Sequence, residues 1–137
     1  MSNKIKLYIF HPYSKIGGAD TSISRLINNL GPEYAIDFFC LGKNNLELNK
    51  KIKILKIKSS RTIFSVKKIR KYLIADRKKN YKKYIFLSNQ NFANILSFAI
   101  KYKLENIKHI IIERNHIDEL KYYNGIKDYF KKKIIKH

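Results

Sequence analysis

The sequence predicts an α/β fold in three layers, with helices on both faces of a mainly parallel sheet. Short apolar runs of strand character alternate with longer segments of helical periodicity along the chain. Parallel strands joined by helices need right-handed crossovers, and these place the helices against the sheet. No internal repeat and no Pro- or Ser-rich linker divides the 137 residues, so we expect one domain.

The first strand is predicted by a run of β-branched and aromatic residues over positions 5–10. It stops before Pro12, because proline lacks the N–H donor that a buried central strand needs. A loop then reaches Gly17 and Gly18, and apolar residues at helical spacing over 23–30 follow at once. The opening of the chain is therefore a strand, a glycine-containing turn and a helix.

Two interpretations of Gly17 and Gly18 remain open. A helix N-terminus with free N–H groups favours an anion, and glycine has no Cβ to keep a phosphate away. The spacing is neither the G-x-G-x-x-G fingerprint nor a P-loop. The alternative is a tight strand-to-helix turn in which glycine serves the geometry alone.

The later part of the chain continues the alternation and completes a Rossmann-like pattern. Lysines alternate with apolar residues at 52–57, which indicates a strand near the sheet edge. Three consecutive isoleucines at 110–112 are typical of a strand covered on both sides. The elements expected after the first helix are strands at 34–41 and 52–57, a helix at 63–79, a strand at 84–87, a helix at 92–100 and a strand at 109–112.

Composition limits the class of protein. One cysteine, Cys40, excludes an intrachain disulfide; it suits a reducing cytosol and is expected to be a buried thiol. No apolar stretch approaches the length of a membrane span, and no signal-peptide pattern opens the chain, so a cytoplasmic protein is expected. The net charge of +20 indicates an anionic partner. It is equally consistent with a coding bias toward Lys, Ile and Asn.

Three polar connections follow predicted strands, over residues 11–19, 88–91 and 113–119. Ligands of parallel α/β sheets bind outside the carboxyl ends of the strands. We therefore expect these connections to gather at one edge of the sheet. Within them, Ser88 and Asn89 are candidates for ligand contacts, whereas His11, beside a proline, is expected to serve a structural turn.

The connection at 113–119 carries charged, amide and imidazole groups directly after a strand. His116 could hydrogen-bond a sugar hydroxyl or a phosphate, and Arg114 offers forked donors to phosphate. Glu113 and Asp118 could orient either one. The alternative is a surface turn of solvated charges in which His116 caps the next helix.

The segment IKLYIFHPYSKIGGADTSISRLINNL resembles the opening of glycosyltransferases of the GT-B fold, in particular the family 4-like N-terminal domain. The strand, the glycine loop and the amphipathic helix match in order. SNQNFANIL and IIIERNHIDEL resemble later motifs of the same domain, so the resemblance covers nearly the whole chain.

The resemblance implies retaining transfer of a sugar from a nucleotide-diphosphate sugar to a glycan or lipid-linked acceptor, in cell-surface polysaccharide synthesis, with no metal ion and no further cofactor. It places Gly17 and Gly18 near the donor diphosphate and His116, as the catalytic candidate, near the transferred sugar. Ile117 departs from the usual motif, in which Asp or Gly follows the histidine directly. The candidates for acceptor or sugar contacts are Ser88, Asn89, Arg114 and Asn115.

GT-B enzymes carry a second Rossmann-like domain that supplies most nucleotide contacts, and the sequence shows no counterpart of it. Residues 126–134 still build an apolar helix face near the last residue, so we expect a truncated N-terminal domain. Such a chain should bind donor weakly and transfer little sugar by itself, because half of the transition-state contacts are missing.

The lysine-rich helix at 63–79 and the lysines at 131–133 predict association with an anionic membrane surface, peripheral to its inner face. The alternative function is a basic nucleic-acid-binding α/β protein, since 10 tyrosines could stack on bases. The tyrosines are scattered and no nucleic-acid motif is present, so nucleic acid is not the favoured partner. A stand-alone domain that pairs with a separate catalytic subunit is the third possibility.

Overall fold

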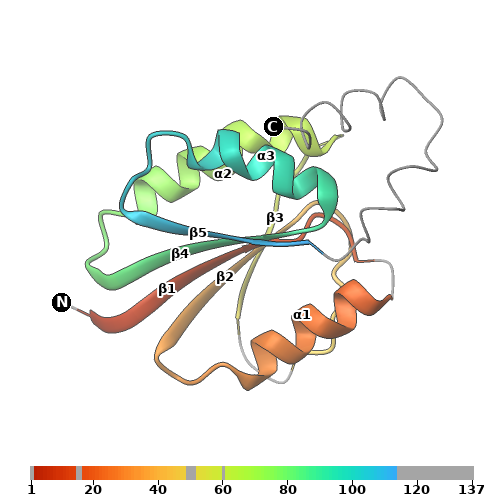
Figure 1. Cartoon of the computed structure of the whole chain (residues 1–137), viewed down its shortest axis with the longest axis horizontal. Coiled ribbons are helices and arrows are strands. Elements are labelled where there is room, and N and C mark those ends of the chain that lie inside the picture. The colour runs from red at the N-terminus through yellow and green to blue at the C-terminus, as the bar shows by residue number, and fades with distance from the viewer. Residues whose placement is uncertain (1, 15–16, 49–51, 60, 114–137) are drawn as a thin grey trace.

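The computed structural model describes residues 2–14, 17–48, 52–59 and 61–113 (Figure 1). Eight elements follow one another in these ranges, and each corresponds to one expected from the sequence. They are β1 (Ser2–Phe10), α1 (Gly18–Asn29), β2 (Tyr34–Cys40), β3 (Lys53–Lys56), α2 (Thr62–Asp76), β4 (Tyr81–Asn89), α3 (Asn91–Lys101) and β5 (Ile107–Ile112). No helix among the described residues is both long enough and apolar enough to cross a bilayer.

The five strands form one sheet in the order β3-β2-β1-β4-β5, and every pairing is parallel. Strand β1 is central, with Tyr8 beside Asp37 of β2 and Phe86 of β4. Parallel pairs need crossover connections, and helices α1, α2 and α3 supply three of them. The predicted α/β class with a parallel sheet is confirmed.

Helices cover both faces of the sheet, so the domain has three layers (Figure 1). On one face, Ile23 and Ile27 of α1 pack with Leu7 and Ile9 of β1. On the other, residues of α2 and α3 pack with alternate residues of the same strands. The alternation follows from the two-residue period of a strand. The side chains of this second cluster are Tyr8, Phe10, Phe39, Ile69, Leu73, Phe86, Ala93, Ile100, Leu104 and Ile107.

The edge strands of the sheet bear on two predictions. Strand β3 is at an edge, as its alternating lysines indicated. Strand β5 is at the opposite edge of the described sheet. Ile107 packs in the cluster under α2 and α3, and Ile110 and Ile112 pack against the cluster under α1, so both faces of β5 are covered in part, although Ile111 is 41% exposed. A continuous apolar run does not encode the position of a strand in its sheet. Cys40 is buried as predicted, and burial raises its thiol pKa.

A closed ionic network lies under the C-terminal end of α2. Lys6 is buried, and its Nζ is 2.7 Å from Asp37 Oδ1 and 3.8 Å from Asp76 Oδ2. Tyr8 donates to Asp76 Oδ2 at 2.9 Å, and Tyr72 donates to Asp37 Oδ2 at 2.7 Å. Each carboxylate thus has both a charged and a neutral donor, which is what burial of a charge requires.

The pKa values of this network follow from its contacts. Burial, and then the charge of Asp76, raises the pKa of Tyr8, so the phenol stays protonated as a donor. Burial alone would raise the pKa of Asp76. The hydrogen bonds from Lys79 and Tyr8 and the charge of Lys6 outweigh it and hold that pKa below its usual value. Asp76 is therefore ionised in the folded protein at neutral pH.

Candidate functional site

The order of the strands creates a topological switch point at the carboxyl ends of β1 and β4, and we call the groups gathered there the crevice. Helix α1 follows β1 and lies on one face of the sheet, whereas α3 follows β4 and lies on the other (Figure 1). The two chain segments therefore diverge where their strands end, and such a switch point is where open α/β sheets bind ligands. Two of the three predicted connections, at 11–19 and 88–91, meet at this point.

His11 is the centre of the crevice. It comes directly after β1, is fully buried, and its Nε2 lies 2.6 Å from Asp20 Oδ1 in the first turn of α1. Asn89 Nδ2 lies 3.1 Å from His11 Nδ1. In the neutral tautomer that satisfies both contacts, Nε2–H donates to the carboxylate and Nδ1 accepts from the amide. His11 thereby joins the ends of β1 and β4 and the start of α1.

We expected His11 to serve a structural turn, and its contacts are structural, but they reach further than a local turn. Its two partners are 9 and 78 residues away along the chain. A polar residue directly after an apolar strand, with an acidic residue in the first turn of the next helix, was the available signal. Asp20 was likewise not a predicted site residue.

Ser88 and Asn89 are predicted site residues, and the structure places both at the crevice. They are the last residues of β4 rather than loop residues, and both are buried. Neither Ser88 Oγ nor Asn89 Oδ1 has a hydrogen-bond partner among the described residues. A buried polar atom without a partner costs roughly 1 to 3 kcal/mol. Such atoms at a strand end are therefore candidates for ligand contacts.

Two further buried oxygens without described partners lie at the same end of the sheet. Ser14 Oγ is in the connection after β1, and Asn94 Oδ1 is in the first turn of α3. The amide nitrogen of Asn94 donates to the Ile112 carbonyl at 2.9 Å and to Glu113 Oε2 at 3.2 Å. In the described ranges, all four buried side-chain oxygens without a hydrogen-bond partner therefore lie around the carboxyl ends of the strands.

Gln90 joins β4 to α3 with a strained backbone. Its φ of 93° lies in a region that non-glycine residues rarely adopt, at a cost of about 1 to 3 kcal/mol. Its Nε2 donates to the Tyr13 carbonyl at 2.6 Å, which ties the two crevice connections together. Strain of this kind is typical of functional sites, where surrounding contacts hold the backbone in place.

Gly17 and Gly18 stand at the N-terminus of α1, and both are exposed. A Cβ added to either one would meet no atom within 4 Å, and neither has a positive φ. Neither the surrounding atoms nor the backbone conformation therefore requires glycine. The open space leaves the first turn of α1 accessible, as the phosphate-facing interpretation needs.

The third predicted connection begins at the same edge of the sheet, because β5 is parallel to β4 and ends at Ile112. Glu113 is exposed and accepts the hydrogen bond from Asn94. The remaining predicted site residues, Arg114, Asn115 and His116, lie outside the described residues. Their roles stay predictions.

No group of three or more His, Cys, Asp or Glu side chains that could hold a metal ion occurs in ranges 2–14, 17–48, 52–59 and 61–113. A scan against protein-family models finds no match, and a search of curated proteins finds no similar sequence. The fold and the crevice define an α/β domain of Rossmann-like topology with a candidate ligand site at its switch point.

Proposed function

We propose that this chain is the N-terminal, acceptor-side domain of a GT-B glycosyltransferase. Such an enzyme transfers a sugar from a nucleotide-diphosphate sugar to a glycan or lipid-linked acceptor. The observation that carries the proposal is the crevice at the ends of β1 and β4. There an accessible glycine pair begins α1, and His11 joins that helix to the end of β4 through Asp20 and Asn89. Ser88 and Asn89 also carry buried polar atoms that have no described partner. The sequence resemblance supports the same assignment.

In this proposal the first turn of α1 faces the donor diphosphate. Backbone N–H groups and the positive end of the helix favour an anion, and Gly17 and Gly18 allow it to approach closely. His11 positions the crevice, because its ring ties Asp20 to Asn89. His116 remains the proposed catalytic residue, with Arg114 and Asn115 as sugar or acceptor contacts.

The Gly18→Ala variant tests the proposal. Alanine suits a helix better than glycine, and a Cβ at this position has room, so the variant should be more stable by about 0.5 to 1 kcal/mol. Its affinity for UDP-glucose or GDP-mannose should nevertheless fall about tenfold, since the Cβ intrudes on the phosphate. Binding is measured by NMR titration, with Lys108→Ala, at an exposed position of β5, as the control outside the crevice.

Opposite changes in stability and affinity support a ligand role for the glycine pair. Binding of neither nucleotide sugar by the unaltered chain, or equal affinity in the variant, contradicts the proposal. A salt-dependent gel shift with RNA or DNA, in the absence of nucleotide-sugar binding, would favour the nucleic-acid alternative.

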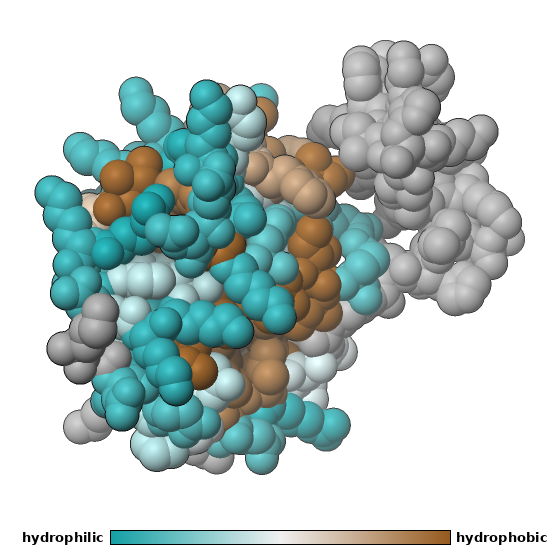
Figure 2. All heavy atoms as spheres, turned by 60° about the vertical axis from the view of Figure 1, so that its left-hand side comes forward, coloured by the Kyte–Doolittle hydropathy of each residue, from teal (hydrophilic) through white to brown (hydrophobic). Residues whose placement is uncertain are grey.

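We also propose that the outer surface of α2 approaches anionic membrane. Lys67, Lys68 and Lys71 are exposed there near the exposed ring of Phe64. Figure 2 shows hydrophilic side chains over much of the visible face, with hydrophobic patches between them. Each well-placed lysine contributes about 1 kcal/mol of attraction to an anionic surface. Sedimentation with phosphatidylserine vesicles should show binding that weakens with salt, and equal binding to neutral vesicles would refute it.

A further inference from the structure

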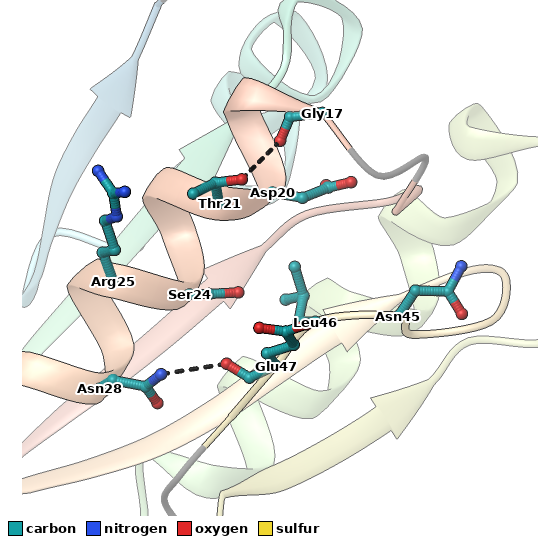
Figure 3. A pocket seen from close by; sticks show the side chains of 9 residues that line it. All are labelled: Gly17, Asp20, Thr21, Ser24, Arg25, Asn28, Asn45, Leu46 and Glu47. Carbon is teal, nitrogen blue, oxygen red and sulfur yellow. Dashed lines mark hydrogen bonds between the residues drawn. The ribbon is translucent and has the colours of Figure 1, made fainter.

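A hollow lies between α1 and the segment 45–47 that follows β2 (Figure 3). Its volume is about 360 Å³, which lies within the range of small-molecule sites. Asn28 Nδ2 donates to the Glu47 carbonyl at 3.1 Å and so fixes the segment against the helix. We call this hollow the α1 cleft.

The α1 cleft presents polar groups that the protein leaves unpaired. Ser24 is 9% exposed, its hydroxyl points toward Leu46 and Glu47 across the cleft, and it has no hydrogen-bond partner among the described residues (Figure 3). The side-chain amide of Asn45 and the guanidinium of Arg25 are also without partners in that part of the chain. A hydroxyl can both donate and accept, so a ligand with hydroxyl groups can satisfy these atoms.

The charge of the α1 cleft differs from that of the chain. Asp20 and Glu47 line it, and Arg25 is the one basic residue among its lining residues, so the cleft is slightly acidic within a chain of net charge +20. Gly17 lines the end of the cleft nearest the proposed donor site, whereas toward Asn28 a phosphate or another polyanion is disfavoured by the two carboxylates. They accept hydrogen bonds from neutral hydroxyls, and Leu46 offers an apolar surface to the C–H face of a sugar ring.

We propose that the α1 cleft binds a neutral glycosyl residue of the acceptor glycan. The inference rests on the proposed function and names the substrate class of its acceptor side. Asp20 joins the two sites, because it lines the cleft and its Oδ1 accepts the hydrogen bond from His11. A glycosyl residue held here is therefore adjacent to the crevice in which the donor is proposed to bind.

The experiment titrates the full 137-residue chain with cellobiose, maltotriose and chitobiose, followed by NMR. We expect at least one of these neutral sugars to shift signals of the cleft residues with millimolar affinity. Ser24→Ala and Asn45→Ala should each weaken that binding about fivefold, as expected for one uncharged hydrogen bond. The matched control is Ser22→Ala, the same substitution on α1 at a residue that does not line the cleft.

Other results overturn the inference. The inference fails if none of the three sugars shifts the signals of the cleft residues. It also fails if Ser22→Ala weakens sugar binding as much as Ser24→Ala does. Binding of glucosamine or pyrophosphate in the cleft, in place of the neutral sugars, would overturn it as well. Titration with UDP-glucose separates the two proposals. Donor binding without sugar binding removes the glycosyl site alone, whereas sugar binding without donor binding leaves a carbohydrate site and removes the glycosyltransferase assignment.

Discussion

Lys6, Asp37 and Asp76 form a buried network where the C-terminal end of α2 meets the sheet, and His11, Ser88 and Asn89 lie at the carboxyl edge of the sheet. Both sets are buried polar groups that include a residue on or directly after β1. In the first set, both carboxylates have an ammonium and a phenol as partners. In the second, Ser88 Oγ and Asn89 Oδ1 have no described partner.

The difference separates polar groups that serve the fold from groups that are available to a ligand. A fully satisfied network rigidifies the core, and losing one member leaves a buried charge uncompensated. An unsatisfied buried group lowers stability and persists where it has another use. Gln90, with its strained backbone, lies in the second region. The same sheet therefore has a closed region, in which the buried polar groups are satisfied, and an open region, in which some are not. Substitutions that remove a polar group should lower stability in the closed region and leave it unchanged or raise it in the open region.

The largest effect is expected from Lys6→Met. Removal of the ammonium leaves Asp37, which is 1% exposed, without its charged partner and should lower the free energy of unfolding by about 3 to 5 kcal/mol. Urea denaturation followed by circular dichroism measures the loss. Lys108→Met, at an exposed position of β5, is the control and should change stability by less than about 0.5 kcal/mol.

If Lys6→Met does not fold, Tyr8→Phe tests the same network more gently. It removes only the hydroxyl that donates to Asp76 and should cost about 1.5 to 3 kcal/mol. A stability equal to that of the unaltered protein in both variants would show that the network is not closed in solution.

A smaller loss of stability than in Lys6→Met is expected when the pH is lowered and Asp76 becomes protonated. Because contacts with Lys79, Tyr8 and Lys6 hold the folded-state pKa of Asp76 below its unfolded value, the unfolded state binds more protons in that range. The contribution of Asp76 to stability is thus complete above a pH of about 4 and is lost as pH falls through the folded-state pKa. Urea denaturation from neutral pH to strong acid should show a smaller stability loss in Asp76→Asn than in the unaltered protein.

The control for the acid experiment is Glu105→Gln, which changes an exposed carboxylate. It should keep the pH dependence of the unaltered protein. Parallel pH profiles for Asp76→Asn and the unaltered protein would contradict the assignment of the acid sensitivity to the closed region.

The smallest change in stability is expected from Ser88→Ala. It removes a buried hydroxyl without a described partner and should leave stability unchanged or raise it by up to about 1 kcal/mol. The matched control is Ser97→Ala, because Ser97 is equally buried but its hydroxyl donates to the Asn94 carbonyl and contacts His109 Nε2. Thermal denaturation compares them, and equal destabilisation by both would remove the distinction between open and closed regions.

The sequence by itself determined the α/β class, the order of the elements, the edge position of β3 and the burial of Cys40. These features depend on local periodicity and on turn residues, which are contiguous in the chain. It also pointed to Ser88 and Asn89, because polar residues directly after an apolar run indicate a strand end. Gly17 and Gly18 were proposed from the order of a strand, a glycine-containing turn and a helix, and their role stays a prediction.

Only the tertiary structure decided which polar groups meet. Asn89 contacts His11 from 78 residues away, and Tyr8 contacts Asp76 from 68. The order of strands in the sheet brings them together, and a hydrophobic period does not encode that order. For the same reason the apolar run of β5 did not reveal that this strand lies at an edge of the described sheet. Periodicity fixes which side of an element is buried, whereas long-range packing fixes its neighbours.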